Sequence, residues 1–241
     1  MEILTIDGRE VRAEGGKVIL EVARENNIYI PSLCDNEGVG AYGACRLCMV
    51  EVISRGRERL VASCLYLVED GLVVKTDSPR IINVRRMVIE LLLARCPDSE
   101  VLQELASKLG VDKPRFTLEE GNRKCILCAL CTRACQEVVG VSAISLVNRG
   151  VNRQMSTPFH VFSEACIACG SCAYICPTKA ISIEDDGDTR IITMPHVTME
   201  FKLTECNTCG RYWAPERQLD YIIKTADLPA DAFDNCPDCR D

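Results

Sequence analysis

Cysteine thiols are the residues of this sequence with the most evident chemistry. The 241-residue chain has seventeen cysteines, and sixteen of them fall into four groups of four with short internal spacings. Thiolates bind soft metals, and C-x-x-C pairs in a protein without export signals are typically metal or redox sites. An odd number of cysteines, clustered two residues apart, also argues against a disulfide framework. The four groups are therefore candidate sets of metal ligands.

The first set has the spacing C-x10-C-x2-C-x15-C. A 2Fe-2S cluster needs four thiolates, and backbone N–H groups near its sulfur atoms stabilise it. Three glycines in residues 38–44 allow the backbone to curl closely around such a cluster. The same glycines match G-x-G-x-x-G, but they do not lie between a strand and a helix, so we interpret the segment as a cluster loop and not as a dinucleotide site. The predicted ligands of this 2Fe-2S cluster are Cys34, Cys45, Cys48 and Cys64.

The second and third sets are two copies of C-x2-C-x2-C-x3-C, which form an internal repeat. In two-cluster ferredoxins the fourth cysteine of each run crosses to the other cluster. Structural zinc seldom uses three cysteines spaced by two, so the repeat predicts two 4Fe-4S clusters. Gln136 follows the first run where Pro177 follows the second, and this difference affects the turn and not the ligands. The predicted sets are Cys125, Cys128, Cys131 and Cys176 for one cluster, and Cys166, Cys169, Cys172 and Cys135 for the other.

The fourth set consists of two C-x-x-C pairs separated by 26 residues near the C-terminus. Four thiolates from two such pairs suit a structural zinc ion, and Gly210 and Pro237 are typical of zinc-ribbon turns. Zinc is favoured, and a further iron–sulfur cluster is the alternative. The amphipathic stretch over residues 215–225 is expected to dock against a partner or the preceding module. The predicted metal ligands are Cys206, Cys209, Cys236 and Cys239.

Regular elements are needed to position these thiols. Runs rich in β-branched residues predict strands over 3–6, 49–53, 60–62 and 72–76, and residues 18–26 have helical character. Apolar residues at helical spacing predict a long helix from Arg80 to Arg95, stopped by Pro97. A second helix is expected over residues 99–109, and residues 111–121 read as a linker.

Charge and hydropathy exclude several classes of protein. The net charge of −7 disfavours a general nucleic-acid partner, and we interpret Arg85 and Arg86 as a solvated helix face. The longest apolar stretch, residues 87–94, is interrupted by Glu90 and is far shorter than the roughly 20 residues of a membrane span. The N-terminal residues have no basic segment and no apolar signal core, so we expect a cytoplasmic protein without a membrane span.

Two stretches of this sequence resemble known iron–sulfur proteins. Residues 45–52, C-R-L-C-M-V-E-V, together with the glycine loop, resemble the ferredoxin module of respiratory complex I and of hydrogenases. Plant-type ferredoxins differ, because their first cysteine interval is about four residues. Residues 124–140 and 143–150 resemble the segment that precedes the catalytic domain of iron-only hydrogenases, and the matching part of related formate dehydrogenases.

One cluster of those relatives is missing here. In them, a loop with one histidine and three cysteines binds another 4Fe-4S cluster after the first module. In this chain Cys96 is the only thiol of that region, and neither of the two histidines lies near it. We therefore expect this site to be deleted and Cys96 to be a buried packing residue.

Nearly all of residues 1–183 resemble the small diaphorase subunit of NAD-linked hydrogenases, including electron-bifurcating complexes. It implies an α+β fold with a β-grasp 2Fe-2S ferredoxin module, a helical connector, a two-cluster 4Fe-4S ferredoxin module and a zinc-ribbon-like knuckle. The expected boundaries are 1–78, 79–120, 121–198 and 199–241.

The function that follows is electron transfer without catalysis by this chain. No flavin fingerprint, P-loop or nickel site is found in the sequence, so the substrate chemistry is expected in other subunits. The expected partners are a flavin and NAD(P)-binding subunit and a catalytic, hydrogenase-type subunit or ferredoxin, in a complex from an anaerobe. A subunit of an NAD-dependent formate dehydrogenase and a free-standing polyferredoxin are the alternatives. A redox-sensing regulator would need a DNA-reading helix and a basic face, and neither is found.

Overall fold

The computed structural model describes residues 1–120 and 123–240. The chain divides into two compact units, Met1–Ala129 and Leu130–Asp241, each of which is described by itself. The predicted linker end and domain boundary at Gly121, and the last residue of the predicted C-terminal segment, fall outside the described residues.

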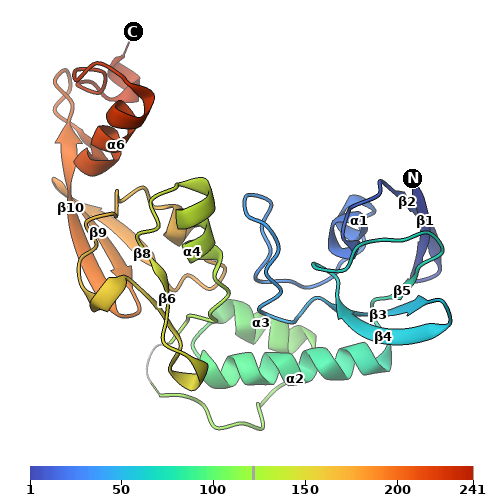
Figure 1. Ribbon diagram of the computed structural model, residues 1–241. Coiled ribbons are helices and arrows are strands. Elements are labelled where there is room, and N and C mark those ends of the chain that lie inside the picture. Colours follow the sequence, from blue (N-terminus) through green and yellow to red (C-terminus); the bar gives the residue numbers. More distant parts are fainter. Residues whose placement is uncertain (121–122, 241) are drawn as a thin grey trace. The chain divides into compact units, whose positions relative to one another are not determined.

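A five-stranded mixed sheet forms the centre of the first unit (Figure 1). Its strand order is β2-β1-β5-β3-β4; β1 and β5 are parallel, and the other neighbours are antiparallel. The strands predicted from β-branched runs are confirmed. The sheet contains β1 (Glu2–Ile6), β2 (Arg9–Ala13), β3 (Met49–Ser54), β4 (Arg57–Ala62) and β5 (Val73–Lys75).

The core of this unit lies between the sheet and helix α1 (Ile19–Glu25). Alternate residues of the strands point to one face, and α1 covers that face with four buried apolar residues. Each buried aliphatic side chain contributes about 1.5–3 kcal/mol relative to an exposed one. Cys48 and Cys64 belong to the same core, so the predicted cluster ligands are held by its packing.

Two helices follow the sheet, α2 (Pro79–Arg95) and α3 (Glu100–Lys108), and both sequence predictions of helices are confirmed. Ser78 is the N-cap of α2, and its Oγ accepts a hydrogen bond from the Ile81 N–H at 3.2 Å. The C-cap is Cys96, directly before Pro97. In the described part of the chain, no helix combines the length and the apolarity that a bilayer crossing needs.

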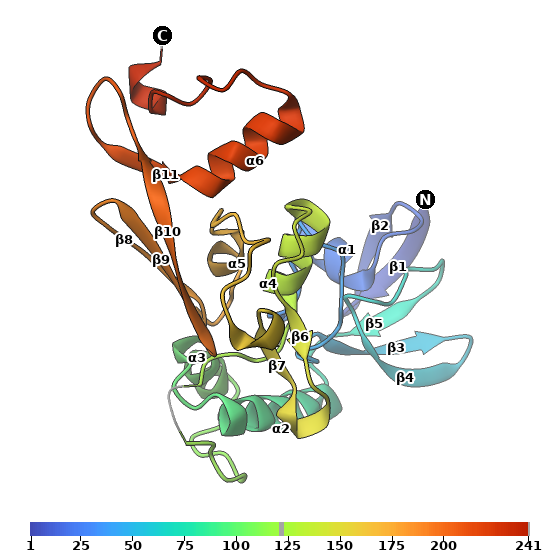
Figure 2. The ribbon, with the colours of Figure 1, turned by 60° about the vertical axis from the view of Figure 1, so that its left-hand side comes forward.

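The second unit contains a four-stranded antiparallel sheet that was not predicted from the sequence (Figure 2). Its order is β11-β10-β9-β8. Strand β10 includes residues 198 and 199, between which the sequence predicted a boundary of two segments. Helix α6 (Glu216–Ala226) follows β11 and contacts β10. The sheet strands are β8 (Ser182–Asp186), β9 (Thr189–Met194), β10 (Val197–Glu205) and β11 (Tyr212–Pro215). The second unit also contains α4 (Leu130–Arg133), the π-helical turn η1 (Ala134–Val138), the hairpin β6 (Ser145–Val147) and β7 (Gln154–Ser156), and α5 (Ser171–Tyr174). Three short 3-10 helices complete its described elements: η2 (Gly150–Asn152), η3 (Pro158–His160) and η4 (Pro237–Cys239).

Candidate metal centres

The four predicted ligands of the 2Fe-2S cluster are all buried in the first unit, and they are arranged as two pairs. The backbone N–H of Cys45 donates to the Cys34 Sγ at 3.3 Å, and the N–H of Leu33 donates to the Cys45 Sγ at 3.4 Å. The Sγ atoms of Cys48 and Cys64 lie 3.4 Å apart. A 2Fe-2S cluster places two thiolates on each of its two irons, so each pair matches the ligands of one iron.

The β3–β4 hairpin explains why Cys48 and Cys64 meet although fifteen residues separate them. Met49 of β3 lies opposite Ala62 of β4, and the Ser63 N–H donates to the Cys48 carbonyl at 3.0 Å. The antiparallel register therefore brings the residue before β3 beside the residues after β4. The strand pairing therefore determines how close these two thiols lie.

The glycine loop adopts backbone conformations that few residues tolerate. Gly43 has φ +70°, and a Cβ on it would lie 2.5 Å from the Leu65 Cδ1. Arg46, between the second and third cysteines, also has a positive φ of 58°. Left-handed φ values of non-glycine residues cost about 1–3 kcal/mol and are concentrated at functional sites. This strain supports the interpretation of the segment as a cluster loop.

Arg85 of α2 holds the backbone on both sides of Cys48. Its Nε donates to the Leu47 carbonyl at 3.1 Å, and its Nη2 donates to the Met49 carbonyl at 2.9 Å. The residue is only 7% exposed, and this burial lowers the pKa of its guanidinium. The expectation that Arg85 lies on a solvated helix face is therefore wrong, because the helix packs this residue against the start of β3; Arg86 is exposed as expected.

Proton distribution within the two thiol pairs is uneven. A side-chain hydrogen bond with Cys45 lowers the pKa of Cys34 to about 6, and a side-chain hydrogen bond with Cys64 lowers the pKa of Cys48 to about 6. The pKa values of Cys45 and Cys64 are raised, chiefly by the same interactions. Metal ligands must be deprotonated, so assembly of the predicted cluster would displace protons chiefly from Cys45 and Cys64.

The internal repeat is visible in the backbone of the second and third sets. Leu127 and Ala168 occupy equivalent positions of the two runs, and both have positive φ, 53° and 58°. Ala129 and Gly170, two residues further along, are also left-handed, with φ values of 63° and 82°. Because the same unusual conformation recurs at equivalent positions, the two runs share the backbone turn before their third cysteine.

One predicted 4Fe-4S ligand set comes together around a single cavity of the second unit. The thiols share this cavity with apolar side chains, including Ile192 and Met194. The Ala143 N–H donates to the Cys135 Sγ at 3.2 Å, as backbone amides do to cluster thiolates. Burial raises the pKa of Cys172 to about 12, so a metal must displace its proton. We call this set, Cys135, Cys166, Cys169 and Cys172, the crossed cluster site.

The other 4Fe-4S set takes Cys125 and Cys128 from the first unit and Cys131 and Cys176 from the second. The binding of one cluster by these four cysteines therefore stays a prediction. The local environment of its last member resembles that of Cys135, because the Ala180 N–H donates to the Cys176 Sγ at 3.2 Å.

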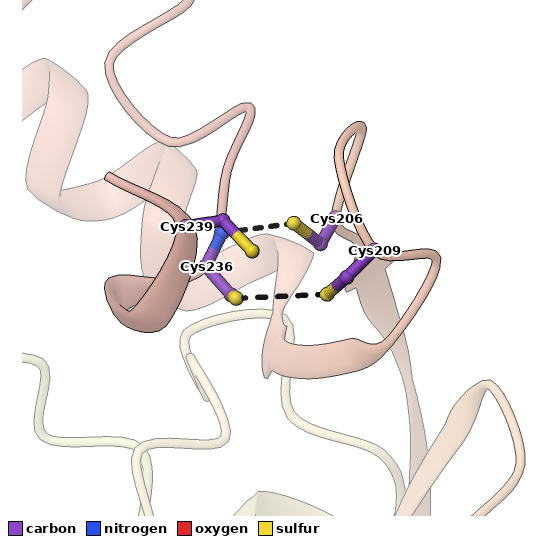
Figure 3. A group of neighbouring side chains, drawn as sticks. All are labelled: Cys206, Cys209, Cys236 and Cys239. Atoms are coloured by element: carbon purple, nitrogen blue, oxygen red, sulfur yellow. Dashed lines mark hydrogen bonds between the residues drawn. The ribbon is translucent and has the colours of Figure 1, made fainter. Parts of the chain in front are cut away.

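The two C-terminal cysteine pairs converge on one point (Figure 3). The four Sγ atoms all lie within 4.8 Å of one another. The Cys236 N–H donates to the Cys206 Sγ at 3.3 Å and is the main cause that lowers the pKa of Cys206 to about 6. A single tetrahedral ion with Zn–S bonds of about 2.3 Å places its sulfurs about 3.8 Å apart. We call these four cysteines, Cys206, Cys209, Cys236 and Cys239, the knuckle site.

The remaining thiol, Cys96, has no exposed surface, and burial raises its pKa to about 12. The prediction of a buried cysteine at this position is confirmed. Within the described residues, all seventeen cysteines lie outside disulfide bonds.

Comparison with known families assigns both cluster regions. A 2Fe-2S iron-sulfur cluster binding domain matches residues 3–79, and a 4Fe-4S dicluster domain matches residues 124–180. The chain is thus an iron–sulfur protein with two cluster-binding domains.

Individual relatives indicate more closely which class of iron–sulfur protein the chain resembles. The chain is 33% identical over 211 residues to the NADP-reducing hydrogenase subunit HndD of Solidesulfovibrio fructosivorans, covering 75% of this chain and 36% of that protein. It is 30% identical over 203 residues to an NADH-quinone oxidoreductase subunit of Rhizobium meliloti, covering 74% of this chain and 23% of that protein. The chain thus spans about a quarter to a third of the length of these relatives.

One solved structure matches over a larger share of its own length than these relatives do. A chain in the crystal structure of an NAD⁺-reducing [NiFe]-hydrogenase in the H₂-reduced state matches with a TM-score of 0.58 and 31% identity. The match covers 65% of this chain and 74% of that chain. The protein belongs to the family of iron–sulfur subunits related to those of NADH-quinone oxidoreductase (complex I) and of NAD-reducing hydrogenases, as the sequence resemblance predicted.

Proposed function

We propose that the chain relays electrons through iron–sulfur clusters between a flavin and NAD(P)-binding subunit and a hydrogenase-type catalytic subunit or ferredoxin. The observation that carries this proposal is the burial of paired thiols in one unit and the convergence of four more on one cavity in the other. Relatives named as hydrogenase and NADH oxidoreductase subunits support the assignment to a multi-subunit complex.

The cofactors of this proposal are one 2Fe-2S cluster on Cys34, Cys45, Cys48 and Cys64, and two 4Fe-4S clusters on the crossed sets predicted above. The residues at the two described sites suit these groups, because each site offers four thiols and N–H donors to sulfur. When bound, the clusters accept and release single electrons. The protein contributes ligands, insulation by apolar side chains and hydrogen bonds to sulfur.

At the knuckle site we propose one zinc ion. Four mutually close sulfurs support a single metal ion, since the thiolates of a cluster bind different irons and are spread around it. We also propose that the chain divides into the four segments predicted above, with a β-grasp fold in the first and a zinc-ribbon-like fold in the last. The cysteines of the described residues lie outside disulfide bonds, which supports the cytoplasmic location that we propose.

Reduction by NADH or NADPH tests the relay. The complex is purified anaerobically through a tag on this chain, and either nucleotide is added while cluster absorbance and EPR spectra are recorded. We expect reduced-cluster signals in the complex, whereas the isolated chain is reduced by dithionite and not by the nucleotides. Clusters of the complex that stay oxidised with both nucleotides, or reduction of the isolated chain by either, would contradict the proposal.

A further inference from the structure

Helix α6 connects the C-terminal segment to the protein loops that carry the crossed cluster site. Arg217, in its first turn, donates from Nη1 to the Glu164 carbonyl at 2.9 Å and to the Cys166 carbonyl at 3.5 Å. Its Nη2 forms an ion pair with the Glu164 carboxylate. One turn later, the Tyr221 hydroxyl donates to the Val139 carbonyl at 3.2 Å. The helix therefore contacts the backbone at Cys166 and a few residues after Cys135.

Aromatic packing holds the Arg217 guanidinium in this position. Its Cζ lies 4.9 Å from the centroid of the Phe162 ring, a cation–π contact, and Phe162 in turn packs against Phe201 of β10 at 5.3 Å between centroids. The arginine is thus fixed by an ion pair, two carbonyls and a ring. Its charge lies next to the loop that carries three of the four cluster ligands.

The two cysteine pairs of the knuckle site lie on either side of α6 in the sequence. The helix lies between Cys209 and Cys236, so a metal bound by both cysteine pairs closes a loop of 26 residues that contains it. Asn207 and Thr208 also bond across the loop, to the Asp234 carbonyl at 2.9 Å and to the Asn235 Oδ1 at 2.8 Å. Closing a loop restricts the conformations available to the enclosed chain. A metal bound at the knuckle site would therefore restrict the placement of α6.

We propose that α6 is a clamp on the crossed cluster site, in which Arg217 favours the reduced cluster by its positive charge and the knuckle metal keeps the helix in place. This inference rests on the proposed cluster at Cys135, Cys166, Cys169 and Cys172. Reduction adds a negative charge, and a nearby cation that donates to the ligand loop stabilises that charge. Arg217 is a positioning and tuning residue, and it gives the C-terminal segment a role in electron transfer.

Redox titration of charge variants, followed by EPR, tests the clamp in the full-length chain. Cys169→Ser first identifies which 4Fe-4S signal belongs to the crossed site. Arg217→Gln is expected to lower the ratio of reduced to oxidised cluster at a fixed potential about two- to fivefold, the range for a partly exposed charge pair. Arg217→Lys, which keeps the charge, is expected to stay within about twofold of the wild type. Lys224→Gln removes the same charge from an exposed position of α6 and is the matched control.

A second arm tests the knuckle. Cys236→Ser is expected to lose the knuckle metal and to lower the same ratio as Arg217→Gln does. An unchanged ratio in Arg217→Gln, or a change equal to that of Lys224→Gln, would refute the clamp even if Cys236→Ser does not fold. Metal loss with an unchanged ratio would refute the role of the knuckle. Absence of both 4Fe-4S signals in the wild type would instead refute the proposed function, so the two failures are distinguishable.

Discussion

Replacing Arg85 with methionine removes a buried cation that bonds to the backbone on both sides of Cys48, a predicted cluster ligand. The two hydrogen bonds, at 3.1 and 2.9 Å, come from a charged donor, and such bonds contribute about 1.5–3 kcal/mol each. Their loss leaves the carbonyls of Leu47 and Met49 without these donors, a gross cost of about 3–6 kcal/mol. The variant no longer buries a charge, which offsets part of this cost. We therefore expect the first unit to lose about 2–4 kcal/mol of unfolding free energy.

Visible circular dichroism of the 2Fe-2S cluster during anaerobic urea unfolding measures this effect. With a urea dependence of about 2 kcal/mol per molar, the midpoint should fall by about 1–2 M. Arg86→Met is the matched control, since Arg86 is exposed and donates to the Leu109 carbonyl at 2.7 Å. Its expected cost is below about 1 kcal/mol, because water can replace the donor at this exposed position. Equal midpoints for the two variants would refute the argument that Arg85 braces the ligand.

Three further predictions concern the metal sites. Cys64→Ser should abolish the 2Fe-2S EPR signal and leave the 4Fe-4S signals in place, and survival of the first signal would exclude Cys64 as a ligand. Ile192→Ala removes a buried side chain, with 0% exposure, from the lining of the crossed cluster site and so enlarges the cavity. Unfolding followed by Trp213 fluorescence should show a loss of about 2–5 kcal/mol in unfolding free energy, and a loss below about 1 kcal/mol would be inconsistent with this packing. Zinc binding by the knuckle site should release more protons as the pH falls through about 6, because Cys206 is then protonated before the metal binds; a proton release that stays constant between pH 8 and pH 5 in calorimetry would contradict the lowered pKa.

Coordination chemistry is the reason that the sequence could predict which cysteines lie close together. A metal site needs several thiols within a few ångströms, and short spacings such as C-x-x-C satisfy this within one loop. The structure brings together the knuckle site and the crossed cluster site from such pairs, including the crossing of Cys135 to the other run. The strands and helices of the first unit were also predictable, because their apolar periodicities are regular.

The sheet of the second unit was missed although a signal was present. Met199, Phe201 and Leu203 alternate with polar residues, and all three are buried. This alternation is typical of a strand with one covered face, but the cysteine pairs that follow it drew the interpretation toward a separate metal knuckle.

Contacts between distant segments could not be read from the sequence. Arg85 bonds to residues 36 and 38 positions earlier, and Arg217 to carbonyls 51 and 53 positions earlier. Each depends on which helix face meets which loop, and a periodicity specifies a face but not its neighbour. Both arginines act on ligand loops, so the residues that position the predicted clusters are those that sequence reasoning did not find.

Metal and sulfide analysis of the anaerobically purified full-length chain tests the central claim most directly. The account predicts about ten irons and about ten acid-labile sulfides per chain, from one 2Fe-2S and two 4Fe-4S clusters, together with about one zinc. An excess of about one iron over sulfide without zinc would contradict the zinc assignment at the knuckle site. A colourless protein with neither iron nor sulfide would contradict the account as a whole.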